Sequence, residues 1–143
     1  MIETESAAPR TATTASTWWH WPVIPFAALG AAFGAGAAVM GMQWLGMMFS
    51  WGSTEGWYWR FAAPIWSSGA FGFALIWAAC RVAPKGKRET GIVALTVLVL
   101  FVLTLVAWAW LKPGLPLSNA IVDTVTSAAL VFGAFGALSE VRQ

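Results

Sequence analysis

The residue with the clearest chemical potential in this chain is Asp123, the only acidic residue within an apolar segment. A carboxylate inside a bilayer is unfavourable unless a cation, hydroxyl groups or water accompany it. Thr126 and Ser127 follow at spacings that place their hydroxyl groups on the same helical face. The spacing predicts an intramembrane polar site, which either anchors an ion pair or lines a path for a solute.

The expected partner of this carboxylate is a basic residue on the same side of the membrane. Arg60 and Lys112 are the two candidates, and Arg60 is preferred because its planar guanidinium can hold a carboxylate through two hydrogen bonds. Glu55 competes for Arg60 from the neighbouring connection. We therefore expect an Arg60–Asp123 pair at one rim of the membrane.

A purely structural role for Asp123 is the alternative. An acidic side chain near a helix N-terminus is stabilised by the positive end of the helix dipole. Ser118 or Asn119 is expected to cap this helix a few residues earlier, since both side chains accept hydrogen bonds from free backbone N–H groups.

His20 is the only histidine, and three tryptophans surround it in the segment STWWHWPVIPF at residues 16–26. A haem or pigment ligand usually lies deeper in a bundle, and haem commonly needs a second strong axial ligand, for which the chain offers no second histidine. Indole rings favour the headgroup level, and further tryptophans are expected at the opposite rim. The pattern favours an interfacial belt at His20, with a pH-sensitive or partner contact as the alternative.

The elements that position these residues are membrane helices. The chain has 143 residues, of which 59% are hydrophobic and 10% are charged, and its mean hydropathy is +0.69. A helix needs about 20 mostly apolar residues to cross the hydrocarbon. Four stretches qualify, at about 22–49, 61–80, 91–111 and 117–138. The sequence predicts an all-α integral membrane protein, a four-helix transmembrane bundle at residues 18–143 that follows a disordered tail at residues 1–17.

The basic residues predict the orientation of this bundle. With four spans, six of the eight Lys and Arg residues fall on one side and only Arg60 and Lys112 on the other. The positive-inside rule then places both the N-terminus and the C-terminus in the cytoplasm. The compact, Ala/Gly-rich chain favours a bacterial inner (plasma) membrane.

Small residues predict how the helices pack. Gly30, Gly34 and Gly41, together with Ala37, form one stripe of the first span and permit close approach by another helix. Gln43 projects about 150° from that stripe, so the first span is expected to touch two partners. Gly133 lies on a small-residue face of the fourth span, which is expected to be central.

The second and third spans are expected to behave differently. Pro64 lies in the first turn of the second span, where its missing N–H group costs least. The third span is bulky and aliphatic nearly all round, so much of it should face lipid. Its Thr96 and Thr104 are expected to hydrogen-bond to their own backbone.

Several function classes lack any sequence support. The single cysteine, Cys80, excludes an internal disulfide and a multi-cysteine metal site, and its position suggests a small buried hydrophobic residue. Phosphate loops, catalytic triads and metal-spaced His or Cys groups are absent from the sequence. We expect no cofactor, no metal, no nucleic acid and no enzymatic activity.

Two functional hypotheses remain. The first is a small non-enzymatic subunit that packs within a larger membrane complex or with copies of itself. The second is a small transporter or channel protomer in which Asp123 lines the path.

Overall fold

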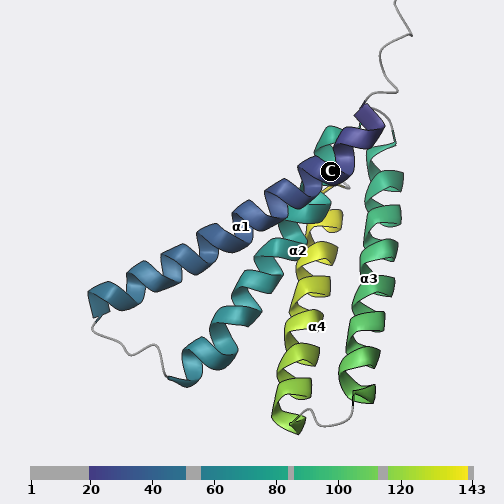
Figure 1. The fold of residues 1–143 in the computed structure, drawn as a ribbon. Coiled ribbons are helices and arrows are strands. Elements are labelled where there is room, and N and C mark those ends of the chain that lie inside the picture. Colours follow the sequence, from purple (N-terminus) through teal and green to yellow (C-terminus); the bar gives the residue numbers. More distant parts are fainter. Residues whose placement is uncertain (1–19, 51–55, 84–85, 113–115, 142–143) are drawn as a thin grey trace, which may run out of the picture.

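The computed structural model describes residues 20–50, 56–83, 86–112 and 116–141, and all regular secondary structure in this part of the chain is helical (Figure 1). Its elements are α1 (His20–Ser50), a π-helical turn η2 (Tyr58–Ala62), α2 (Ala63–Val82), α3 (Lys87–Leu111) and α4 (Leu117–Glu140). All four α-helices are long and apolar enough to cross a membrane. The predicted four-span, all-α membrane fold is confirmed, whereas the tail predicted at residues 1–17 lies outside the described residues.

The helices alternate in direction, which gives the bundle two distinct ends. Figure 1 shows that α1 and α3 begin where α2 and α4 end; we call this the α2–α3 end. The ends of α1 and α3 and the starts of α2 and α4 form the α3–α4 end. Both termini of the described bundle therefore lie at the same end.

The central helix is α2, and the expectation that the fourth span would be central is wrong. Helix α2 packs against α1, α3 and α4, whereas α4 packs mainly against α2 and α3. Small residues occur on several helices, so a small-residue face alone does not indicate which helix will pack against it. In this chain the small faces of α2 and α4 cover each other.

Glycines bring the backbones of α2 and α4 into direct contact. A Cβ atom built on Gly133 would lie 2.0 Å from the carbonyl oxygen of Gly69, and one on Gly72 would lie 2.0 Å from that of Leu130. No side chain fits at either glycine without moving a backbone. Close approach of this kind increases dispersion contacts, which drive helix association where lipid removes the hydrophobic driving force.

A small apolar core lies beside this glycine contact. Ile76 and Ala134 are fully buried, and Cys80 and Ala137 complete the cluster. The expectation that Cys80 is a buried hydrophobic residue is confirmed, since its side chain is 2% exposed. Gly91 of α3 lies against Cys80, which lets α3 join the core at the α2–α3 end.

The first helix contacts the bundle through one face only. Ile24, Ala28 and Ala32 of α1 are buried, and the first two pack with Ala79 of α2. Figure 1 shows α1 inclined away from α3 and α4. Between α1, α2 and α3 this inclination leaves an apolar groove of ≈ 490 Å³ near the α2–α3 end.

The third helix faces outward, as predicted. Its buried residues are only Gly91, Val102 and Ala109 among the 25 that form it. The hydroxyl groups of Thr96 and Thr104 donate to the carbonyl oxygens of Ile92 and Leu100, both at 2.8 Å. These bonds confirm the expected back-bonding and satisfy the hydroxyl hydrogens of both residues in an apolar surrounding.

Local chemistry also sets where the second span begins. Pro64 lies in the first turn of α2, as expected. Proline has no N–H group to donate to the carbonyl of Arg60, four residues earlier. The preceding turn η2 is π-helical, and the N–H of Ala63 bonds instead to the carbonyl of Tyr58.

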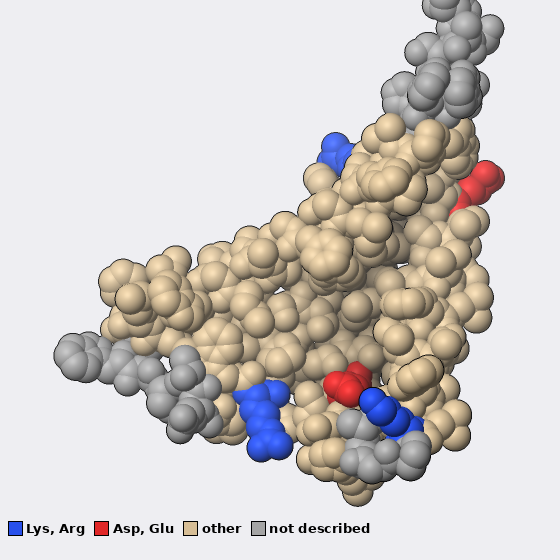
Figure 2. All heavy atoms as spheres, in the orientation of Figure 1, with Lys and Arg blue, Asp and Glu red and all other residues tan. Residues whose placement is uncertain are grey.

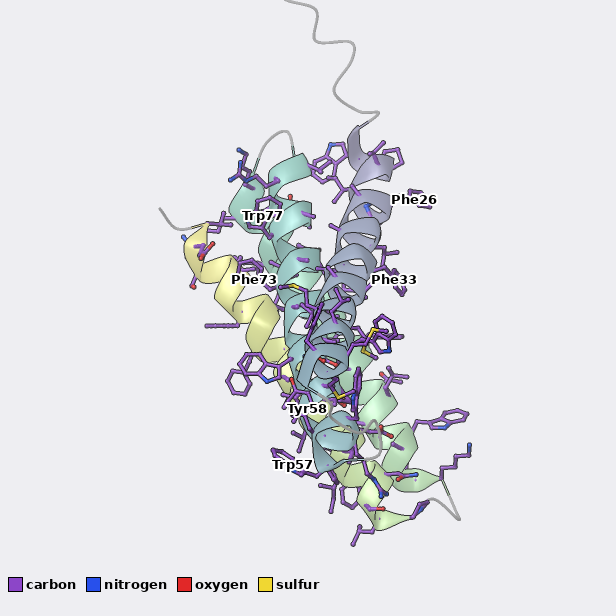
Figure 3. All side chains as sticks on the ribbon, turned by 90° about the vertical axis from the view of Figure 1, so that its left-hand side faces the viewer. Phe26, Phe33, Trp57, Tyr58, Phe73 and Trp77 are labelled. Carbon is purple, nitrogen blue, oxygen red and sulfur yellow. The ribbon has the colours of Figure 1, made fainter. Side chains whose placement is uncertain are left out.

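Exposed aromatic residues mark both ends of the bundle. Figure 3 shows Trp57 and Tyr58 at the start of the second span and Trp77 toward the other end. Trp57 and Trp108, near the α3–α4 end, are 73% and 67% exposed, and Trp21 lies at the opposite end. The guanidinium of Arg81 stacks 4.9 Å from the Trp77 ring centroid. Indole rings at both ends are typical of a bundle anchored at two membrane surfaces.

Candidate functional site

The site predicted around Asp123 is a polar pocket between α3 and α4. Asp123, Thr126 and Ser127 of α4 line it together with Lys112, which directly follows α3. The pocket has a volume of ≈ 340 Å³, and its remaining walls are the apolar residues Leu105, Val106, Trp108 and Ala109. The predicted carboxylate and both predicted hydroxyl groups therefore share one cavity near the α3–α4 end.

Helix ends fix the two sides of this pocket. The N–H of Lys112 donates to the carbonyl of Trp108 at 3.0 Å, which closes the last turn of α3. On α4, Ala120 is buried, and so is Ala109 of α3. The indole N–H of Trp110 donates to the hydroxyl of Thr124 at 3.1 Å and ties α3 to α4 directly.

The hydroxyl group of Thr126 faces the pocket mainly as an acceptor. It donates to the carbonyl of Val122 at 2.8 Å, and the carbonyl of Asp123 lies 3.1 Å away. Since its single hydrogen is directed to the backbone, the lone pairs of the oxygen remain for a donor. Asp123 adds carboxylate oxygens that also accept hydrogen bonds when ionised.

The structure places Lys112, and not Arg60, in the pocket with Asp123. The Arg60 guanidinium lies 5.8 Å from the ring centroid of its neighbour Phe61. Within the described part of the chain, neither cation forms an ion pair with Asp123. Figure 2 shows acidic atoms with basic atoms to either side at this end of the molecule. Glu55, the expected competitor, lies outside the described residues.

The expected helix cap differs from the observed one. Helix α4 starts at Leu117, so Ser118 and Asn119 lie inside its first turn and do not cap it. Pro116 precedes the helix and accepts the N–H of Asn119 at 2.9 Å through its carbonyl oxygen. Asp123 is the seventh residue of α4, beyond the first turn in which the dipole effect is largest.

Gln43 lies on the side of α1 that faces α2. Counting about 100° per residue, it falls on the same side as the buried Ile24, Ala28 and Ala32. Its Oε1 atom is buried and has no hydrogen-bond donor among the described residues. The side chain is remote from the pocket of Asp123, whose lining contains no residue of α1.

The candidate packing glycines divide into two groups. Gly133 lies in the α2–α4 contact, against the backbone of Gly69. Gly30, Gly34 and Gly41 of α1 face open space, because a Cβ atom on any of them would meet nothing within 4 Å. This open stripe lies about 140° around the helix from Ala28, the middle of the buried face that packs on α2.

His20 is the first residue of α1, and its side chain lies outside the described part of the structure. The choice between an interfacial belt and a ligand therefore stays a prediction. The described residues contain no group of three or more His, Cys, Asp or Glu side chains placed to hold a metal ion.

Sequence reasoning named Lys112 as one of two possible cations but preferred Arg60. One signal in the sequence favours Lys112. It directly follows the third span, and the short connection after it brings the start of the fourth span close by. Comparison of the chain with protein-family models, curated proteins and solved structures gives no match.

Proposed function

We propose that this chain is a small non-enzymatic membrane subunit that packs against copies of itself or against another membrane protein. The observation that carries the proposal is the open glycine stripe of α1, formed by Gly30, Gly34 and Gly41. The same chain uses glycines where its own helices touch most closely, between α2 and α4. The stripe offers an equivalent surface that no described helix of the chain covers.

Helix energetics support this reading. Glycine in a helix interior is less favourable than alanine by about 1 kcal/mol, so three glycines along one face weaken α1 unless a contact compensates. Lipid chains are as apolar as leucine and gain nothing specific from a flat glycine surface. A second helix gains close backbone contact there, which is the compensation that we propose.

The mass of the intact assembly tests the proposal. We expect chain purified from a mild detergent, and chain extracted directly into lipid nanodiscs, to have the mass of several copies or of a complex with a second protein. Recovery as a monomer in both preparations would contradict the proposal. The nanodisc preparation controls for dissociation by detergent.

A small transporter or channel protomer is the second candidate, and the pocket of Asp123 favours it. The pocket combines a carboxylate and two hydroxyl groups of the fourth span with the ammonium group of Lys112, which lies just beyond the third span. Ion or solute flux into liposomes that contain only this chain, abolished by Asp123→Asn, would support this candidate. An Asp123→Asn chain with unchanged flux would remove Asp123 from the path.

We also propose that the bundle resides in a bacterial inner membrane with both termini in the cytoplasm. The Ala/Gly-rich composition supports the choice of membrane. The distribution of charge supports the orientation, since Arg60 and Lys112 are the only Lys and Arg residues at the α3–α4 end within the part of the chain that the structure describes. A reporter fused after Gln143 or inserted near Gly86 should report the cytoplasm. A reporter near Ser53 or Gly114 should report the opposite side. Labelling of position 86 by an impermeant reagent in intact cells would refute this orientation.

A further inference from the structure

The pocket between α3 and α4 has the polar groups and the position to hold a lipid headgroup. We propose that it binds an ethanolamine phospholipid, with the primary ammonium group at Asp123 and the phosphate at Lys112. The inference goes beyond the proposed assembly and does not depend on it, since no residue of α1 lines the pocket.

The charges of the pocket suit a zwitterionic ligand. Asp123 and Lys112 line one cavity of ≈ 340 Å³, yet they form no ion pair with each other. Neither group has an ion-pair partner among the described residues, and a carboxylate and an ammonium group that line one cavity match a ligand that carries one charge of each sign. The headgroup of an ethanolamine phospholipid carries a cationic ammonium and an anionic phosphate joined by a short link.

The pocket offers hydrogen-bond acceptors to a ligand with several N–H donors. The carboxylate of Asp123 only accepts hydrogen bonds, and the hydroxyl of Thr126 already donates to the backbone. A primary ammonium group has three N–H donors and satisfies several of these acceptors at once. A quaternary ammonium group has none, so the pocket should distinguish ethanolamine from choline headgroups.

The carboxylate of Asp123 lies near the membrane surface. Helix α4 has 24 residues and is about 36 Å long, and Asp123 lies about 9 Å from its start, against about 30 Å of hydrocarbon. Centred in the bilayer, the Cα atom of Asp123 then lies about 6 Å inside the hydrocarbon boundary. The Cα–Cβ bond of a helical residue tilts toward the N-terminus of its helix, which here points to the near membrane surface. The carboxylate therefore approaches the headgroup level.

The remaining walls favour a lipid over a free headgroup. Leu105, Val106, Trp108 and Ala109 form an apolar surface beside the polar groups. This surface suits the apolar part of an amphiphile, and free phosphoethanolamine has no such part. Lys112 has a flexible apolar stem that lets its charged end stay at the phosphate level.

Native mass spectrometry of the full chain with added lipids tests the proposal. The probes are phosphatidylethanolamine, its N-methyl and N,N-dimethyl derivatives, phosphatidylcholine and phosphatidylglycerol, all with identical acyl chains. We expect the chain to retain phosphatidylethanolamine about five- to tenfold better than phosphatidylcholine, because the choline headgroup cannot form the charge-assisted hydrogen bonds to Asp123. Retention should fall with each added methyl group. Equal retention along the methylation series would overturn the proposal without requiring any variant.

Two variants test the assignment of each charge. Asp123→Asn should bring the ratio of ethanolamine to choline lipid close to one. Lys112→Gln should lower retention of both lipids and leave their ratio largely unchanged, because both carry a phosphate. Glu140→Gln, at the opposite end of α4, is the matched control and should behave as the wild type. An unchanged ratio in Asp123→Asn would overturn the assignment.

A competition experiment distinguishes a bound lipid from free phosphoethanolamine, which carries the same charged groups. Free phosphoethanolamine, added at the lipid concentration, should not displace the bound lipid. Displacement as effective as that by the lipid itself would overturn a lipid ligand and indicate a small zwitterion instead. The result is separate from the assembly experiment, because lipid retention can be measured on the monomer and on any assembly.

Discussion

Replacing Gly133 with alanine is expected to force α2 and α4 apart and to lower the free energy of unfolding by about 1–3 kcal/mol or more. The added Cβ atom would lie 2.0 Å from the carbonyl oxygen of Gly69 and 2.8 Å from its carbonyl carbon. Both are backbone atoms, so no side-chain rotation relieves the overlap. Unfolding of the chain in detergent or bicelles, followed by tryptophan fluorescence, measures the effect.

The matched control lies one turn further along the same helix. A Cβ atom at Gly136 would meet only the Phe73 ring, at 3.9 Å, which is ordinary van der Waals contact. Gly136→Ala should therefore be neutral, or stabilising by up to about 1 kcal/mol through the lower entropy of the unfolded chain. Equal destabilisation by Gly133→Ala and Gly136→Ala would show that α2 and α4 do not meet at Gly133.

The same contact can be tested from its other side. Gly72→Ala places a Cβ atom 2.0 Å from the carbonyl oxygen of Leu130, whereas Gly69→Ala places one 3.7 Å from that of Ala129. The first substitution should destabilise the chain about as strongly as Gly133→Ala, and the second should cost little. This pairing shows that the helix register, and not the number of glycines, determines where a side chain is excluded.

Hydropathy and length were sufficient to predict the four spans. Each helix needs about 20 apolar residues and the connections are short, so few other arrangements of the chain were possible. The outward-facing third helix was also predictable, because Leu and Val cover nearly all its sides and it has few small residues. These properties belong to single helices and require no knowledge of neighbours.

The pairing of helices was not predictable from the same information. In a soluble bundle the apolar stripe of a helix indicates which side is buried, but a membrane helix is apolar on every side. Glycine stripes were visible on α1, α2 and α4, and the most regular one, from Gly30 to Gly41, is the one left open. The close contact formed instead between Gly69 and Gly72 of α2 and the facing segment of α4.

The candidate site was partly predictable for a related reason. Asp123, Thr126 and Ser127 lie within one helix, so their shared face follows from helical spacing alone. The position of the cation depends on structure outside that helix. Arg60 lies in the π-helical turn η2, before Pro64. The hydrogen bonds of a π-helix span five residues and not four, so side chains in this turn point in other directions than they would in an α-helix. Lys112 reaches the pocket because α3 ends beside α4.

Substitutions on the open face of α1 should abolish assembly without unfolding the chain. Gly34→Leu adds a bulky side chain where a Cβ atom meets nothing within 4 Å, so the fold of the single chain should tolerate it. The same side chain would hold a second helix away from the α1 backbone and remove the close contacts on which association depends. We expect the assembly mass to fall to that of a monomer, and Gly30→Leu to act in the same direction.

Ala107→Leu is the control for this experiment, since it also enlarges a small exposed residue on a membrane helix, but on the outward face of α3. It should leave both assembly and unfolding unchanged.

The variants together distinguish glycines that pack within the chain from glycines that pack against a partner. Gly133→Ala should lower stability whether or not the chain assembles, while Gly34→Leu should lower assembly alone. Loss of assembly in Ala107→Leu to the same degree as in Gly34→Leu would show that bulk anywhere on the surface disrupts association, and the glycine stripe of α1 would then not be the interface.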